Sequence, residues 1–481
     1  MDKQTDCEAC TPLALVIGMG ASGLASLEYL LERGYRVRVA DTREMPPAKA
    51  KFEAHPDVEL ITGHLDPEML DGVSVLVMSP GISPLYGAAA PLVSAAREKG
   101  IEVVGEIELF ARELQRLRRE KDYRPVVIGI TGTNGKTTTT SLTGKMVAAC
   151  GRSVIVAGNI GPNAVHELLT AEHENRLPEV WVLELSSFQL ETTSSLEPDA
   201  AAYLNLTEDH IDWHGSLQAY GEAKARIFKP GTVRVVNRED SATLSYARGG
   251  VTVSFGQDTP VNNGDAGLIS NNGHTVLVRR DNDVIVPLIA EEDLHILGRH
   301  NAMNALAALL LIHAAGLPEA PAIEALRAYR GEPHRVEEVL TTADGVTFVD
   351  DSKGTNVGAV IAAVKGFGQQ HRRVLILMGG DGKGQDFTPL AEALKGVAGA
   401  VALIGRDAPG IAAAIAPAGI PQTRFTSLEE AVEWLWNRRQ KGDVILLSPA
   451  CASWDMFKDY AERSARFVAR AHQLAGRIES C

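Results

Sequence analysis

The chain has 481 residues, of which 45% are hydrophobic and 22% are charged, and its formal net charge is −14. This composition predicts an ordinary globular protein of about three domains at roughly 150 residues each. The acidic balance argues against a general nucleic-acid or anionic-membrane surface, so an anionic substrate must be met by local cations. The longest apolar run, 305–312, is far too short to span a bilayer, and residues 1–6 lack the apolar core of a signal peptide. We therefore expect a cytoplasmic protein without a membrane segment.

The five cysteines are sparse for so long a chain. An odd, scattered set indicates reduced thiols rather than a disulfide framework. Cys7 and Cys10 form a lone CxxC pair in a polar tail, and zinc needs about four ligands. We expect free thiols at Cys7, Cys10, Cys150, Cys451 and Cys481.

The first predicted strand, 13–17, is followed by Gly18-Met19-Gly20-Ala21-Ser22-Gly23 and a helix over 24–33. A second strand, 36–40, ends at Asp41. This is the full dinucleotide-binding fingerprint, in which loop amides hold a pyrophosphate and the acid meets a ribose. Taken alone, it indicates NAD or FAD.

Further elements complete a first α/β domain: a strand over 73–78, a helix over 89–99, a strand ending at 104 and a helix over 106–119. The third predicted strand ends at Ser79-Pro80-Gly81. A charged run, 116–124, ends at Pro125 and predicts a domain boundary.

The next stretch predicts a phosphate site. An apolar strand, 126–130, runs into Thr131-Gly132-Thr133-Asn134-Gly135-Lys136-Thr137, and a helix is expected over 141–149. In such a loop the amides and the helix N-terminus face anionic oxygens, Lys136 reaches the β/γ-phosphates and Thr137 can hold Mg²⁺. Because Ile130 stands where the usual pattern has its first glycine, this is a variant of the loop. ATP is the expected ligand.

Three residues of the central domain are candidates for chemistry. Glu184 stands inside an apolar strand, where a carboxylate is costly unless it is paired or binds a metal. His210 follows a strand end and could bind a metal or contact phosphate. Lys224 lies in a helical stretch, and its spacing alone predicts a plain surface lysine.

The remaining sequence continues the α/β pattern. Alternating strands and helices predict a largely parallel central sheet, followed by short β runs and two helices. After Gly331-Glu332-Pro333, a hairpin at Asp344-Gly345 and four buried strands predict a third α/β domain. The predicted domains are 1–121, 122–331 and 332–481. The predicted strands are 153–157, 181–185, 200–204, 233–237, 251–255, 275–279, 284–288, 347–349, 374–378, 400–404 and 444–447, with helices over 300–315 and 320–329.

Several of these blocks, in one order from about Leu13 to the C-terminus, resemble the Mur ligase family. The resemblance is carried by 131–137, 158–161, 183–191, 205–210, 298–301, 333–335 and 447–453. It implies a three-domain fold with a Rossmann-like UDP-binding domain, a central P-loop ATPase-type domain and a Rossmann-like C-terminal domain. It also implies a ligase of peptidoglycan synthesis that uses ATP and Mg²⁺, with two magnesium sites expected. In this reaction a substrate carboxylate becomes an acyl phosphate, and the amine of an amino acid then displaces phosphate.

The resemblance assigns roles residue by residue. The catalytic positions would be Lys136, Asn159, Glu184, His210 and Lys224. The metal positions would be Thr137, Glu184, His210 and Lys224, the last as a carbamate. ATP would be bound by Gly132, Thr133, Asn134, Gly135, Lys136, Thr137, Thr138, Asn301, Asn304 and Arg335. The UDP substrate would be bound by Gly18, Met19, Asp41, Thr42, Arg43, Ser79, Pro80, Gly81, Asn159 and His210.

The amino acid to be added is read in the third domain. Asp351-Ser-Lys-Gly-Thr-Asn356 resembles the branch of the family that adds D-glutamate to UDP-N-acetylmuramoyl-L-alanine. A second carboxylate on the amino acid calls for cations and hydroxyls. The resemblance offers Lys353, Thr355, Lys383, Ser453 and Tyr460 for them.

Three alternatives stay open from the sequence. A ligase for another amino acid would share most of the motifs, an NAD-binding oxidoreductase would use the N-terminal fingerprint, and a P-loop switch or motor would hydrolyse ATP without a UDP-sugar. We expect a monomer with no nucleic-acid partner.

Overall fold

The computed structural model describes residues 11–46, 48–271, 273–296 and 298–479, so Cys7, Cys10 and Cys481 lie outside the described residues. Two compact units make up the chain. The first contains residues 1–269, 278–288 and 306–326, and the second contains 270–277, 289–305 and 327–481. Each unit is described by itself below. The bounds 1–121, 122–331 and 332–481 stay a prediction.

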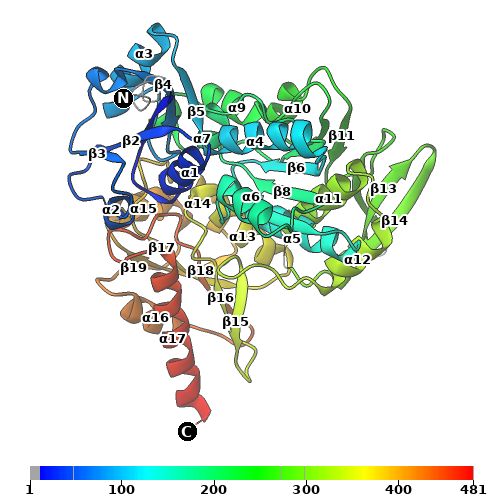
Figure 1. Ribbon diagram of the computed structural model, residues 1–481. Coiled ribbons are helices and arrows are strands. Elements are labelled where there is room, and N and C mark those ends of the chain that lie inside the picture. Colours follow the sequence, from blue (N-terminus) through cyan, green and yellow to red (C-terminus); the bar gives the residue numbers. More distant parts are fainter. Residues whose placement is uncertain (1–10, 47, 272, 297, 480–481) are drawn as a thin grey trace, which may run out of the picture. The chain divides into compact units, whose positions relative to one another are not determined.

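The first sheet has five parallel strands in the order β3-β2-β1-β4-β5 (Figure 1). Buried Val, Leu and Ile residues explain why the central strands β1 and β4 read as nearly continuous apolar runs. The order reverses between β1 and β4, and ligands of such sheets bind outside the carboxyl ends of the strands at that point. The elements are β1 Leu13–Ile17, α1 Ala21–Glu32, β2 Arg36–Asp41, α2 Lys49–Glu53, β3 Glu59–Thr62, β4 Val73–Met78, α3 Ala90–Glu98, β5 Glu102–Gly105 and α4 Glu106–Lys121.

The second sheet has nine strands in the order β14-β13-β12-β11-β10-β9-β6-β8-β7. Strand β6 lies between β8 and β9, and all the pairs from β7 to β12 are parallel. Its elements up to β10 are β6 Val126–Thr131, α5 Lys136–Ala149, β7 Val154–Gly158, α6 Ala164–His173, β8 Val180–Glu184, α7 Ser187–Glu191, β9 Ala200–Tyr203, α8 Ile211–His214, α9 Leu217–Ala225 and β10 Val233–Asn237. The later ones are α10 Ser241–Tyr246, β11 Thr252–Phe255, β12 Ala266–Asn271, β13 His274–Asp281, β14 Val284–Ala290, α11 Arg299–Ala314 and α12 Glu319–Ala328.

The third sheet has six strands in the order β15-β16-β20-β17-β18-β19, of which only β15 runs antiparallel to its neighbour. Apolar side chains pack on both of its faces. The elements are β15 Glu337–Thr341, β16 Thr347–Asp350, α13 Val357–Gln369, β17 Val374–Gly379, α14 Pro389–Leu394, β18 Ala398–Ile404, α15 Ala408–Ile415, β19 Gln422–Arg424, α16 Leu428–Trp436, β20 Val444–Leu447 and α17 Tyr460–Glu479.

The predicted α/β class with mostly parallel sheets is confirmed. The helix expected over 141–149 begins earlier, at Lys136, because the threonine run 137–140 continues the helix despite its low intrinsic propensity. Sequence periodicity also missed β3, β12 and β19, which are short or polar. Within the described residues, no helix is long and apolar enough to cross a membrane.

Candidate active site

The phosphate loop connects β6 to α5 in the first unit. Gly135 is the N-cap of α5 and has φ +83°, a backbone conformation that glycine adopts without strain. Lys136 folds back over the loop, and its Nζ donates to the carbonyl oxygens of Gly132 and Thr133 at 2.9 Å each. Thr137 and Thr138 are largely buried in the first turn of the helix. This arrangement provides a helix N-terminus and an ammonium group for an anion.

A second loop braces the phosphate loop from β9. Asn205 Oδ1 accepts from the amide of Asn134 at 2.8 Å, and its Nδ2 donates to the Asn134 carbonyl at 3.0 Å. The Thr133 hydroxyl donates to the Thr207 carbonyl, and it accepts from the Tyr220 hydroxyl at 3.3 Å. Asn205 and Tyr220 therefore hold the loop in shape, and no sequence pattern predicts this role for them.

Glu184 ends β8 with a buried side chain that is 2% exposed. Its Oε1 accepts from Asn159 Nδ2 at 2.7 Å, and the Asn159 amide donates to the Glu184 carbonyl at 2.8 Å. Its Oε2 is buried and has no hydrogen-bond partner within the described part of the chain. A buried carboxylate oxygen left in this way is suited to a cation, because an unsatisfied buried charge is costly.

Lys224 is 1% exposed, so the surface position that its spacing predicted is wrong. Helix α9 packs this side chain inward, where Nζ donates to the Gly132 carbonyl at 2.8 Å and lies 4.5 Å from the centre of the Tyr220 ring. Burial, and then the charge of Lys136, lower the pKa of Lys224 well below its ordinary value, although Asp209 and Glu184 oppose this. The pKa shift therefore favours the neutral form of this amine, beside the phosphate loop, more than in an exposed lysine.

His210 lies at the N-terminus of α8 with φ +53°, in the left-handed region. Its ring packs edge-on against Phe188, with the ring centres 4.6 Å apart. His214, four residues on, is buried, and its Nε2 lies 3.0 Å from Ser187 Oγ. Burial, and then the charge of Lys224, lower the pKa of His214 to about 4. The sequence analysis assigns no role to His214, although its position four residues after His210 places the two histidines one helical turn apart.

The N-terminal fingerprint residues gather at the carboxyl ends of β1, β2 and β4. Gly18 has φ +103°, and a Cβ there would lie 2.7 Å from Ser79 Oγ. Asp41 is fully buried and accepts from the Met19 amide at 2.8 Å and from the amide, Nε and Nη2 of Arg43 at 2.8–2.9 Å. Thr42, Ser79 and Pro80 are half-buried beside them, and Gly81 is exposed.

Burial alone would raise the pKa of Asp41, but the hydrogen bonds from Arg43 and Met19 lower it below its ordinary value. Because protein donors already occupy both carboxylate oxygens, Asp41 organises the loop around itself. This differs from the ribose-binding acid of a dinucleotide site.

In the second unit, three loops meet at the carboxyl ends of β16, β17 and β20. Asp381 and Ala452 exchange backbone hydrogen bonds of 3.0 and 2.8 Å. Buried Arg463 joins the loops after β16 and β20, donating to the carbonyls of Ser352 at 2.7 Å and Cys451 at 3.1 Å.

Four of the predicted D-glutamate residues lie on these loops, and the fifth, Tyr460, is the first residue of α17. The Nζ of Lys353 lies 5.2 Å from the Tyr460 ring centre, and Lys383 Nζ lies 5.8 Å from the Trp454 ring centre. Ser453 is buried next to Trp454, and the Thr355 amide donates to the Lys353 carbonyl. The structure thus brings two ammonium groups and two hydroxyl residues to one edge of the third sheet.

Three further predicted nucleotide residues belong to the second unit. Asn301 and Asn304 lie on α11, both mostly buried, and Asn304 Nδ2 donates to Asn301 Oδ1 at 3.1 Å. Arg335 follows the left-handed His334, and its charge helps to lower the pKa of Asp351. Burial is the larger effect and raises the pKa of Asp351 to about 7.

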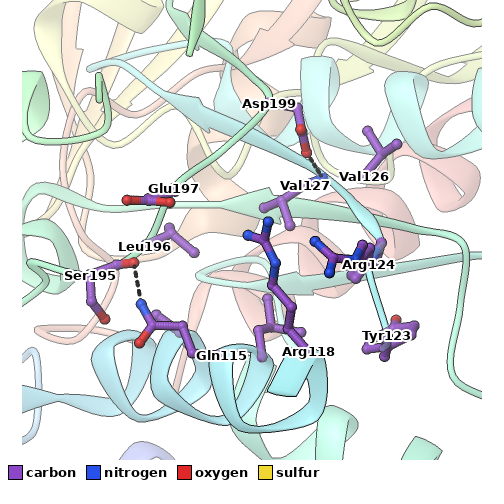
Figure 2. A pocket seen from close by; sticks show the side chains of 13 residues that line it. Gln115, Arg118, Tyr123, Arg124, Val126, Val127, Ser195, Leu196, Glu197 and Asp199 are labelled. Carbon is purple, nitrogen blue, oxygen red and sulfur yellow. Dashed lines mark hydrogen bonds between the residues drawn. The ribbon is translucent and has the colours of Figure 1, made fainter. Parts of the chain in front are cut away.

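A separate cavity of about 260 Å³ lies at the other end of β6, between α4 and the segment 195–199. Figure 2 shows Arg118 and Gln115 reaching into it from the helix, with Gln115 bonded to the Ser195 carbonyl. None of its lining residues is one of the predicted site residues. The cavity is therefore distinct from the phosphate loop, which follows the carboxyl end of the same strand.

Comparison with protein-family models gives three matches along the chain. A Mur ligase MurD-like N-terminal domain matches residues 13–105, the Mur ligase middle domain matches 130–312, and the Mur ligase glutamate ligase domain matches 334–451. A UDP-N-acetylmuramoylalanine–D-glutamate ligase of Paraburkholderia xenovorans (strain LB400) is 50% identical, covering 96% of each chain. The chain belongs to the Mur ligase family.

Three further comparisons agree. The ligase of the same name from Ralstonia nicotianae is 49% identical over 97% of this chain and 98% of its own. The crystal structure of the MurF ligase from Thermotoga maritima in complex with ADP has a TM-score of 0.59 at 17% identity, covering 98% of this chain and 96% of that one. The UDP-N-acetylmuramate–alanine ligase MurC of the same organism has a TM-score of 0.58 at 19% identity, covering 96% and 99%. These structures support the Mur ligase fold.

Proposed function

We propose that this Mur ligase adds D-glutamate to UDP-N-acetylmuramoyl-L-alanine in peptidoglycan synthesis, at the expense of ATP. The proposal rests on relatives named for this activity, which match 96–97% of the chain at 49–50% identity. The phosphate loop, with Lys136 folded over it, fits the same reaction. We further propose that the enzyme is a cytoplasmic monomer with the domains 1–121, 122–331 and 332–481.

The chemistry explains why ATP is needed. A carboxylate is inert to amines, so its oxygen first attacks the γ-phosphorus of ATP, which forms an acyl phosphate and releases ADP. The amine of D-glutamate then attacks the carbonyl carbon, the C–O bond to phosphate breaks, and the amine loses a proton. The loop amides and Lys136 would stabilise the charge that develops on the transferred phosphoryl group.

The donor set fits a divalent cation. Glu184 Oε2 is a buried carboxylate oxygen without a hydrogen-bond partner in the described part of the chain, and Asn159 holds the other oxygen in place. Thr137, Glu184, His210 and Lys224, the last as a carbamate, would hold Mg²⁺ at two sites. Mg²⁺ would neutralise negative charge where two anions have to meet. Asn159 would keep the Glu184 carboxylate oriented and would also contact the muramoyl substrate.

The modification of Lys224 is supported by its surroundings. A neutral amine nitrogen can attack the carbon of CO₂, which forms a carbamate and releases one proton. Burial favours the neutral form of the Lys224 amine, because it lowers the pKa. The product would be a carboxylate-like group beside Glu184.

The UDP moiety and the incoming amino acid would bind to loops other than the phosphate loop. In the first unit, the UDP moiety would lie on Gly18, Met19, Asp41, Thr42, Arg43, Ser79, Pro80 and Gly81. In the second unit, D-glutamate would meet Lys353, Thr355, Lys383, Ser453 and Tyr460, and ATP would meet Asn301, Asn304 and Arg335. The rival NAD site is disfavoured, because Asp41 already accepts hydrogen bonds from Met19 and Arg43 at both of its oxygens.

The test is phosphate release from ATP in the presence of UDP-N-acetylmuramoyl-L-alanine and one amino acid at a time. D-glutamate, L-glutamate, meso-diaminopimelate and L-lysine would be compared, and the amide product identified by mass spectrometry. We expect release and product with D-glutamate only. Release with another amino acid would keep the ligase and reject the glutamate site, whereas no release with any amino acid would reject the ligase.

A further inference from the structure

The loop that follows β4 is tied to the turn that carries His210. Ser83 Oγ donates to the Trp213 carbonyl at 3.0 Å, and the same oxygen accepts from the amides of Leu85 and Tyr86 at 3.2 Å each. One hydroxyl thus uses its donor and both of its acceptor positions. It links two segments that lie 130 residues apart in the sequence.

A close approach at Gly215 strengthens this link. Gly215 has φ +80°, and a Cβ there would lie 2.2 Å from the Tyr86 hydroxyl, so a larger residue would displace the tyrosine. Helix α8 has four residues and is bounded by His210 and Gly215, both left-handed. Such a short turn has little stability of its own, so its position depends on contacts from outside.

Aromatic ring contacts connect Trp213 to His210 through Phe188. The Trp213 ring is largely buried and stacks on Phe188, with the ring centres 4.5 Å apart. Phe188 in turn packs edge-on against His210 at 4.6 Å. A displacement of the Trp213 backbone would therefore change the position of the His210 ring, because packed side chains transmit small shifts.

We propose that Ser83 is a positioning residue that couples occupancy of the UDP-binding loop to the placement of His210. The inference rests on the proposed function, because it takes Ser79 and Gly81 as contacts of the UDP moiety. These residues lie two to four positions before Ser83 in the same loop, so a bound UDP group would fix the loop and, through the Ser83 hydroxyl, helix α8. Binding of the UDP end of the substrate, which is remote from the reacting carboxylate, would thereby set the position of His210 near the reacting end.

The kinetic test uses Ser83→Ala, with Ser74→Ala as the matched control. Ser74 Oγ also donates to a backbone carbonyl, that of Leu13 at 3.0 Å, but it lies on β4 before the loop. We expect Ser83→Ala to lower kcat about tenfold and to raise the Mg²⁺ concentration for half-maximal activity severalfold. Changes of this size correspond to the free energy of about one lost hydrogen bond. The Kd for UDP-N-acetylmuramoyl-L-alanine, measured by calorimetry without ATP, should change less than about twofold. Ser83→Thr, which keeps the hydroxyl, should recover most of the loss, and Ser74→Ala should match the wild type.

A binding measurement separates this inference from the ligase assignment. UDP-N-acetylmuramoyl-L-alanine, added without ATP or D-glutamate, should change the tryptophan fluorescence of the wild type and of Ser83→Thr. The change should shrink in Ser83→Ala and be lost in Trp213→Phe. Wild-type kinetics in Ser83→Ala, or a loss of substrate binding with kcat and the Mg²⁺ requirement unchanged, would overturn the coupling. Failure of the wild type to ligate D-glutamate would instead overturn the proposed function, because the fluorescence response does not require ligation.

Discussion

Glu106 allows a quantitative prediction about stability. It begins α4 with a side chain that is 2% exposed, and its Oε1 accepts from the Val165 amide at the start of α6 at 2.7 Å. Its Oε2 is buried without a hydrogen-bond partner among the described residues. Burial raises the pKa from 4.5 to about 7, although the hydrogen bonds from Val165 and Ala164 oppose the rise. The folded chain therefore binds this proton more tightly than the unfolded chain does.

The sign and size of the effect follow by linkage. Below pH 4.5 the carboxyl is protonated in both states and the wild type has no penalty from it. Between pH 4.5 and about 7 the unfolded chain releases this proton while the folded chain keeps it, so stability falls over this range, and the penalty levels off above pH 7. At ~1.36 kcal/mol per pKa unit the penalty is about 1 kcal/mol at pH 5 and about 3 kcal/mol at pH 8.

The perturbation is Glu106→Gln, which keeps an oxygen for the Val165 amide and removes the titration. Urea unfolding followed by circular dichroism at pH 5, 6, 7 and 8 gives the stability of each protein. The free energy of unfolding of the variant minus that of the wild type should rise by about 2–3 kcal/mol between pH 5 and pH 8. Any fixed cost of the new amide group shifts all four values equally. Glu98→Gln on the exposed face of α3 is the control. A wild-type-to-variant difference that stays constant across this range would refute the reasoning.

Three further predictions concern the proposed site. Lys224→Ala should lose ligation roughly 100- to 1,000-fold while calorimetry shows ATP binding within about threefold of the wild type, and full activity would remove Lys224 from the mechanism. Glu184→Gln, which can still accept from Asn159, should raise the Mg²⁺ concentration for half-maximal activity at least about tenfold, and an unchanged requirement would reject Glu184 as a ligand. Arg43→Ala leaves the buried Asp41 without its ion-pair partner and should raise the KM for the UDP substrate about tenfold with kcat unchanged. A fall in kcat alone would contradict the assignment of Arg43 to the UDP loop.

Much of the fold was predictable because its signals are local. Buried parallel strands read as short apolar runs, so β1 and β4 were expected at the bounds that the structure has. The phosphate loop was equally visible, since its glycines and Gly-Lys-Thr follow a strand and open a helix. Strands such as β3 and β19 were missed because their side chains are partly exposed and polar, so neither apolar length nor alternation marks them.

The site itself needed the tertiary structure. On α9 nothing local distinguishes Lys224 from a surface lysine; it is buried because the helix packs that face against the phosphate loop, where Gly132 accepts its hydrogen bond. The unpartnered oxygen of Glu184 likewise depends on Asn159, which arrives from a neighbouring strand and takes only one side of the carboxylate. The sequence by itself determined which segments are strands, helices and anion-binding loops, because these depend on nearest neighbours along the chain. Only the tertiary structure decided which charges are buried and paired, because burial is set by segments that meet from far apart in the sequence.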